Sequence, residues 1–148
     1  MSAMAQTSGE SIREERLKKL QMLRDAGMEP YPATSLRDTS VKDFLAHFET
    51  YEKSGEVRFV AGRVMSLRGQ GGILFADLFD GTGRGQLVLQ KEDVDAASFD
   101  LFGNVVDIGD FIEVNVAAYK TKRGVQSMKI SEWKMLAKSL MPIPSEWY

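Results

Sequence analysis

A phenyl ring and a carboxamide on two neighbouring predicted strands form the first group of residues that could do chemistry. Phe75 and Asp77 share one face of the strand expected at 73–80, and Gln86 lies on the matching face of the next strand. A tight glycine turn between the strands sets Gln86 opposite Asp77 and diagonal to Phe75, within reach of an aromatic side chain. A ring that stacks beside an amide that donates and accepts suits an unstacked nucleobase. The alternation leaves two interpretations open, because Phe75 is either exposed for stacking or covered by the N-terminal helices or a loop.

Basic residues flank this pair and could hold phosphates around it. They are Arg63 and Arg68 on the first predicted strand, and Lys120, Lys122 and Arg123 at the turn between the last two. The alternative for each single cation is solvated surface charge.

Glu132 conflicts with the pattern of the last predicted strand, at 125–136. Strict alternation turns it toward the core together with Ile130, where an unpaired carboxylate is too costly to expect. Either a bulge resets the alternation, or Glu132 lies at the rim of the barrel and accepts a hydrogen bond from a base. The other interpretation is a surface glutamate paired with a lysine.

Helical patterns come first along the chain and strand patterns follow. Ser11 and Glu14 form a capping box, which predicts a helix from Ser11 and leaves residues 1–10 as a disordered tail. A second helix is expected from Ser40 through the apolar positions up to Tyr51. Residues 11–56 are therefore predicted to be an N-terminal helical extension.

Five strands follow, with one short helix among them. The strands are expected at 57–67, 73–80, 84–90, 110–120 and 125–136, and the helix at 91–102. This order predicts a mainly β fold, a five-stranded Greek-key barrel of the OB-fold type over residues 57–141, with a short helix between strands 3 and 4. A β-sandwich would need more strands, and an SH3-like barrel would lack the helix. Residues 142–148 are expected to begin a linker.

Composition excludes several classes of site. The 148 residues include no cysteine and one histidine, so disulfides, thiolate zinc sites, a catalytic triad and any metal site are not expected. No segment is long and apolar enough to span a membrane, and no secretory signal precedes the first helix, so a cytoplasmic protein is expected.

The net charge of −2 conceals two basic regions. Residues 57–90 hold four basic and two acidic side chains, and residues 119–148 hold six basic and two acidic side chains. Binding to phosphate depends on such local charge.

A set of short motifs follows in order along the chain. They are LRDAGMEPYP at 23–32, VAGRVMS at 60–66, FADL at 75–78, GRGQL at 83–87, GD at 109–110, YKTKRG at 119–124 and LAKSLMPIP at 136–144. Together they resemble the anticodon-binding domain of class II lysyl-tRNA synthetases, in the subgroup shared with the aspartyl and asparaginyl enzymes. The resemblance extends from about residue 13 to the last residue.

The resemblance implies roles for particular residues. Phe75 is expected to stack on the central uridine of the anticodon, Gln86 and Glu132 to read that base, and Arg68 to assist with the anticodon loop. Gly72 and Phe79 replace a lysine and a glutamine that are usual in the family, which affects the loop contacts.

The resemblance also implies a binding partner, and it implies that this fragment binds without catalysing a reaction. The partner is the anticodon loop of tRNA(Lys), and the family is homodimeric. The class II catalytic motifs are missing from this sequence, so the fragment itself is expected to need no cofactor and to catalyse nothing, whereas the full-length enzyme would use ATP and Mg²⁺ to attach lysine. Two alternatives stay open: an OB-fold module that binds single strands without sequence preference, and one that binds oligosaccharide or protein.

Overall fold

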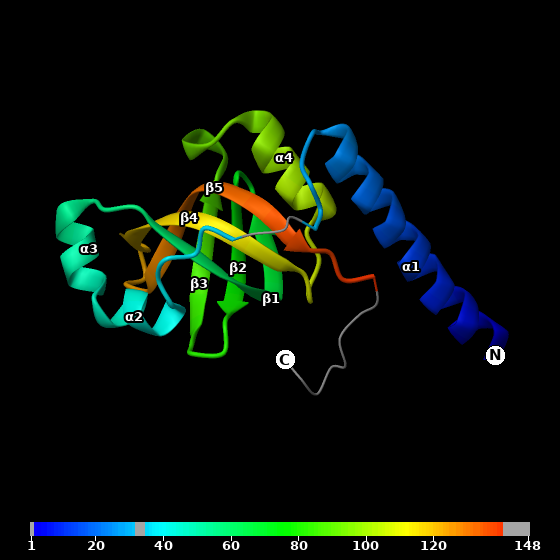
Figure 1. The fold of residues 1–148 in the computed structure, drawn as a ribbon, viewed down its shortest axis with the longest axis horizontal. Helices are drawn as coiled ribbons and strands as arrows, with labels where there is room; N and C mark the ends of the chain where they lie inside the picture. Colours follow the sequence, from blue (N-terminus) through cyan, green and yellow to red (C-terminus); the bar gives the residue numbers. More distant parts are fainter. Residues whose placement is uncertain (1, 32–34, 141–148) are drawn as a thin grey trace.

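A closed barrel of five strands is the centre of the molecule, and helices cover its ends and one side (Figure 1). The computed structural model describes residues 2–31 and 35–140, and the side chains from residue 10 onward within them. The elements are α1 (Ser2–Asp25), α2 (Val41–Ala46), α3 (Phe48–Ser54), β1 (Arg58–Gln70), β2 (Ile73–Phe79), β3 (Arg84–Gln90), the 3-10 turn η1 (Lys91–Asp93), α4 (Ala96–Val105), β4 (Phe111–Lys120) and β5 (Gln126–Ala137).

The strand order confirms the predicted OB-fold. The strands close in the order β1-β2-β3-β5-β4, with all neighbours antiparallel except β3 and β5, which pair in parallel through residues 86–88 and 127–129. The helix expected between the third and fourth strands is present as η1 and α4. Strand β3 has the predicted bounds, and β1 is longer than predicted by three residues at its end.

Apolar side chains from alternate strand positions fill the barrel, and helices close both ends. At one end, α4 contributes Phe102, whose ring meets Trp133 of β5 edge-on with centroids 5.1 Å apart. The Trp133 indole N–H donates to the Ser98 hydroxyl at 3.0 Å, so its polar atom is satisfied. At the other end, Phe44 and Phe48 of α2 and α3 are buried against the barrel.

The first helix is longer than the sequence predicts, which corrects the expectation of a disordered tail at 1–10. Helix α1 begins at Ser2, so Ser11 lies inside the helix and does not cap it. The segment before Ser11 contains alanine, methionine and glutamine and no proline, so its helix propensity permits the extension. The predicted linker at 142–148 lies outside the described residues.

The second predicted helix is divided in two at His47. The Ser40 hydroxyl accepts from the amide of Asp43 at 3.1 Å and caps α2, as its position predicts. His47 then leaves helical geometry (φ −108°, ψ 23°), and its Nδ1 lies 2.9 Å from the Asp43 carbonyl oxygen.

An ionic cluster attaches α1 to the barrel. We call Lys19, Asp107, Asp110 and Lys138 the anchor cluster. Lys138 Nζ lies 2.6 Å from a carboxylate oxygen of each aspartate, and Lys19 Nζ lies 2.7 Å from Asp107. The side chains of Lys138 and Asp110 are fully buried.

Burial and ion pairing act differently on the two carboxyls of the anchor cluster. Burial raises the pKa of Asp110, and the charge of Lys138 offsets this only in part. Burial also tends to raise the pKa of Asp107, but hydrogen bonds from Lys138 and Lys19 outweigh burial and hold this pKa below its usual value.

Candidate nucleic-acid interface

Three of the predicted site residues, Arg68, Phe75 and Gln86, lie on the outer face of β1, β2 and β3. In the strand register, Arg68 of β1 pairs with Phe75 of β2, and Phe75 pairs with Val88 of β3. Asp77 pairs with Gln86, as the glycine turn predicts. Because side chains at paired positions point to the same face, Arg68, Phe75 and Gln86 gather on one surface.

Phe75 is half-buried, and the guanidinium of Arg68 lies over its ring. The Arg68 Cζ atom is 5.1 Å from the ring centroid, and Arg68 itself is exposed. The guanidinium donates to Gln86 Oε1 at 2.8 Å. These three side chains therefore form one connected group, which we call the Arg68–Phe75–Gln86 group.

The amide of Gln86 is oriented by contacts on both sides. Its Oε1 accepts from Arg68, and its Nε2 donates to the Ser127 hydroxyl of β5 at 3.1 Å. The Ser127 hydroxyl in turn donates to the Val125 carbonyl at 3.2 Å. Since Oε1 has a second lone pair and Nε2 a second hydrogen, the amide can still accept from and donate to a base edge.

A bulge resolves the conflict at Glu132. The β4–β5 register shifts between Asn115 and Val116, which turns Glu132 outward while Ile130 stays buried. Glu132 is exposed, and Asn115 Nδ2 donates to its carboxylate at 3.3 Å. This hydrogen bond joins Glu132 to β4, and the β3–β5 pairing ends at Lys129, before Glu132 is reached. The structure does not join Glu132 to the Arg68–Phe75–Gln86 group.

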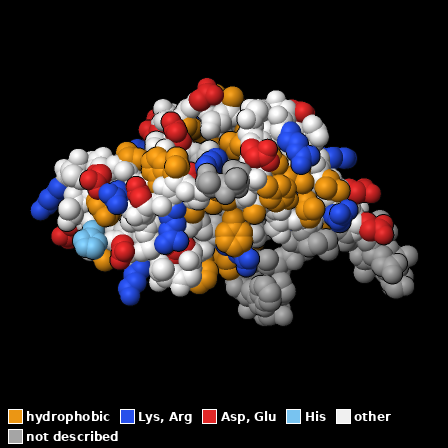
Figure 2. All heavy atoms as spheres, viewed as in Figure 1, with side chains coloured by type: hydrophobic (Ala, Val, Ile, Leu, Met, Phe, Trp, Pro, Cys, Tyr) orange, Lys and Arg blue, Asp and Glu red, His pale blue; other side chains and the backbone are white. Residues whose placement is uncertain are grey.

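The predicted phosphate-binding cations fall into two places. Lys120, Lys122 and Arg123 are exposed at and beside the β4–β5 turn. Arg63 instead pairs with Phe79, at the opposite end of β2 from Phe75. On the side seen in Figure 2, acidic and basic side chains are interspersed, so attraction for phosphate depends on such local groups.

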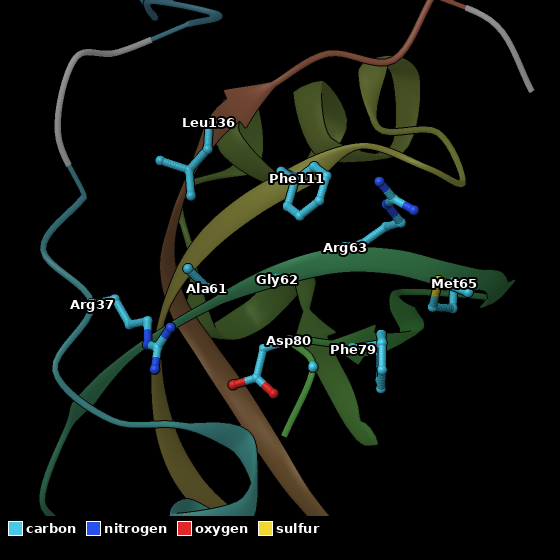
Figure 3. A pocket seen from close by; sticks show the side chains of 10 residues that line it. Arg37, Ala61, Gly62, Arg63, Met65, Phe79, Asp80, Phe111 and Leu136 are labelled. Carbon is cyan, nitrogen blue, oxygen red and sulfur yellow. The ribbon is translucent and has the colours of Figure 1, made fainter. Parts of the chain in front are cut away.

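Arg63 lines a separate hollow of about 520 Å³ (Figure 3). Its guanidinium carbon lies 4.7 Å from the centroid of the Phe111 ring, and its Nε is buried without a hydrogen-bond partner in the structure. Phe79, Asp80 and Leu136 also line the hollow. Arg63 therefore belongs to a different surface from Arg68, although both lie on β1.

Asp80 organises the turn beside this hollow. Its carboxylate accepts from the amides of Val41, Thr82 and Gly83 at 2.9–3.2 Å. Partial burial raises its pKa, but these bonds and the one from the Thr82 hydroxyl outweigh burial and lower it. Within the part of the chain whose side chains are described, no three acidic or histidine side chains lie together as a metal site, and no helix there could span a membrane.

Sequence reasoning missed several polar side chains on this face. Ser127 lies beside Gln86, and Lys129, Tyr119 and Gln90 lie further across the same face. Tyr119 and Ser127 are register partners, so alternation along the last two strands could have placed them on one face with each other. Their position beside Gln86 depends on the parallel pairing of β3 with β5.

A closed five-stranded barrel with an arginine, an aromatic ring and an amide grouped on its outer face defines a nucleic-acid-binding module of the OB type. Residues 59–142 match the family model described as "OB-fold nucleic acid binding domain", and the chain belongs to this family.

Proteins with similar sequences include lysine–tRNA ligases. A lysine–tRNA ligase of Pelotomaculum thermopropionicum is 40% identical over 90% of this chain, one of Methanosarcina mazei is 37% identical over 90%, and one of Thermotoga maritima is 35% identical over 93%. The chain spans only 26–28% of the length of these relatives. These matches confirm the resemblance to lysyl-tRNA synthetases that the motifs indicated.

Proposed function

We propose that this chain is the anticodon-binding part of a lysyl-tRNA synthetase and binds the anticodon loop of tRNA(Lys). The observation that carries the proposal is the Arg68–Phe75–Gln86 group, in which a half-exposed ring, a cation and an oriented amide meet on one face. A base stacked on Phe75 would meet the amide of Gln86 at its edge, and Arg68 would lie over or beside it.

The cations at the β4–β5 turn extend this surface. Lys120, Lys122 and Arg123 would contact phosphates of the loop, and Glu132 would contact the loop from the adjoining part of β5. Arg63 would contribute through the hollow at the other end of β2. The whole protein would attach lysine to tRNA(Lys) with ATP and Mg²⁺, act as a homodimer and reside in the cytoplasm, whereas this chain would only bind.

The test compares two anticodon stem-loops that differ in one base. Fluorescence anisotropy at fixed salt would measure the affinity for a loop with three uridines in the anticodon and for one with cytidine at the centre. The proposal requires weaker binding to the cytidine loop. Equal affinity for both loops, with dependence on length and salt alone, would support a module without sequence preference and overturn the proposal.

A pair of variants locates the binding face. Phe75→Ala should weaken binding by about 1–3 kcal/mol if the ring stacks on a base. Met22→Ala is the control, because Met22 is an exposed apolar side chain on α1, outside the strands that carry the proposed site. An equal loss in both variants would contradict the assignment of the site to Phe75.

A further inference from the structure

A second aromatic and polar group lies on the same outer face, on the far side of Val88 from Phe75. Lys129 Nζ is 4.9 Å from the centroid of the Tyr119 ring, and Gln90 Nε2 donates to the Tyr119 hydroxyl at 3.3 Å. We call Tyr119, Lys129 and Gln90 the Tyr119 group. It joins three strands, since its members come from β4, β5 and β3.

The strand register fixes how far the Tyr119 group lies from Phe75. Phe75 pairs with Val88, and Val88 pairs with Lys129, so the three residues form one row across β2, β3 and β5. Neighbouring strands are about 4.8 Å apart, which puts the Cα atoms of Phe75 and Lys129 about 10 Å apart. Val88, which lies between Phe75 and Lys129 in this row, is only 1% exposed.

We propose that the Tyr119 group is a second nucleotide subsite, which binds the nucleotide adjacent to the one stacked on Phe75. This inference rests on the proposed function and names the residues that would bind a neighbouring base of the same loop. The base lies against Tyr119, and the ammonium of Lys129 contacts the phosphate or a base oxygen. Because the Tyr119 oxygen accepts from Gln90, this contact does not use the hydroxyl hydrogen, which can donate to a base carbonyl.

Asp93 holds Lys129 in the absence of RNA. Its carboxylate lies 3.0 Å from Lys129 Nζ, and both side chains are about 30% exposed. An ion pair this exposed to solvent is weak, so a phosphate can replace Asp93 as the partner of Lys129. Asp93 therefore competes with RNA for Lys129.

The rival account is that Tyr119 and Lys129 only cover Val88. In that case, removing either side chain would lower stability, and any change in RNA affinity would be the same whatever base occupies the neighbouring position. If the Tyr119 group is a nucleotide subsite, the loss of RNA affinity in the protein variant depends on which base of the RNA is present.

The experiment crosses protein variants with abasic substitutions in the stem-loop. Two RNAs lack the base on one or the other side of the central uridine, and a third lacks the central base. Tyr119→Leu should weaken binding of the intact loop by about 5- to 160-fold, the range expected for one stacked base. With one of the two RNAs that lack a flanking base, Tyr119→Leu should cause almost no loss of affinity, because the base that Tyr119 would contact is already absent. With the RNA that lacks the central base, Tyr119→Leu should cause the same fold loss as with the intact loop.

Charge variants test the role of Lys129 separately. Lys129→Met should weaken binding and reduce the salt dependence by the contribution of about one phosphate contact. Asp93→Asn should strengthen binding, because it releases Lys129. Lys18→Met, an exposed cation on α1, is the matched control and should change neither affinity nor salt dependence.

The outcomes separate this inference from the proposed function. Loss on Phe75→Ala with no dependence of the Tyr119→Leu effect on either flanking base would overturn the second subsite and leave the first. No loss on Phe75→Ala would overturn the proposed function itself. Weaker binding of Asp93→Asn would also contradict the competition between Asp93 and RNA.

Discussion

The guanidinium carbon of Arg68 lies 5.1 Å from the centroid of the Phe75 ring. The planar guanidinium therefore occupies part of the surface on which a base would stack, and its bond to Gln86 keeps it there. In the proposed complex, a base would share or replace this contact, and a replaced guanidinium would lie over the base as a second stacking partner. Under the proposal, the free protein would already hold these three side chains close to the arrangement that binding requires.

Arg68→Lys should weaken loop binding although it preserves the charge. A lysine has no planar group to stack on a base and cannot donate in the fork geometry of arginine, so a loss of about tenfold is expected. Arg84→Lys is the control, because Arg84 is an arginine on the same face that pairs with Asp77 at 3.4 Å and is also exposed. Titration of both variants with the same stem-loop at one salt concentration makes the comparison, and equal losses would show that only charge matters.

The two closely packed glycines of the barrel should respond differently to alanine. A Cβ on Gly62 would lie 2.7 Å from the backbone oxygen of Phe79, which cannot move without opening the β1–β2 pairing. A Cβ on Gly85 would meet the Cε atom of Met128 at 2.6 Å and Val41 Cγ1 at 3.2 Å, and the end of a methionine can change rotamer.

Gly62→Ala should therefore lower the free energy of unfolding by about 3 kcal/mol or more, and Gly85→Ala by about 1–2 kcal/mol. Urea unfolding followed by circular dichroism would measure both. The reverse order of the two losses would contradict this account of the barrel.

Much of the barrel could be predicted because its signals are local. Residues 84–90 alternate, follow the glycine turn at 81–83 and precede a segment with a helical pattern that begins at Lys91, so both ends of β3 were predicted correctly. The pairing of Asp77 with Gln86 followed from the turn length alone. The first helix was placed wrongly because Ser11 and Glu14 form a capping box in sequence, whereas helix propensity continues through it to Ser2.

The candidate site was predictable only in part, because some contacts depend on strands that are distant in sequence. The parallel pairing of β3 with β5 brings Ser127 to Gln86 and Lys129 to Val88, and no local pattern specifies that pairing. The bulge at Asn115 decides which way Glu132 points, and alternation alone left that undecided. Arg63 and Arg68 look equivalent in sequence, yet the register puts them beside different aromatic rings.

Lys138→Met should be strongly destabilising. It leaves the fully buried carboxylate of Asp110 without its cation, and removal of one partner of a buried ion pair costs about 3–5 kcal/mol. The double variant Lys138→Met with Asp110→Asn should recover part of the loss, because it no longer buries an unpaired charge. Urea midpoints would measure this. No recovery in the double variant would show that the loss comes from packing of the lysine stem.

Asn substitutions at the two anchor aspartates should change the acid sensitivity of the fold in opposite directions. The pKa of Asp107 is lowered in the folded state, so its contribution to stability is present above the unfolded value of about 3.9 and is lost as the pH falls through the folded value. The pKa of Asp110 is raised, so its contribution is present at low pH and is lost as the pH rises through the folded value. Asp107→Asn should therefore make the loss of stability between about pH 6 and pH 3 shallower, and Asp110→Asn should make it steeper. Urea midpoints at several pH values in that range would measure both slopes, and a change of the same sign in the two variants would contradict the opposite shifts.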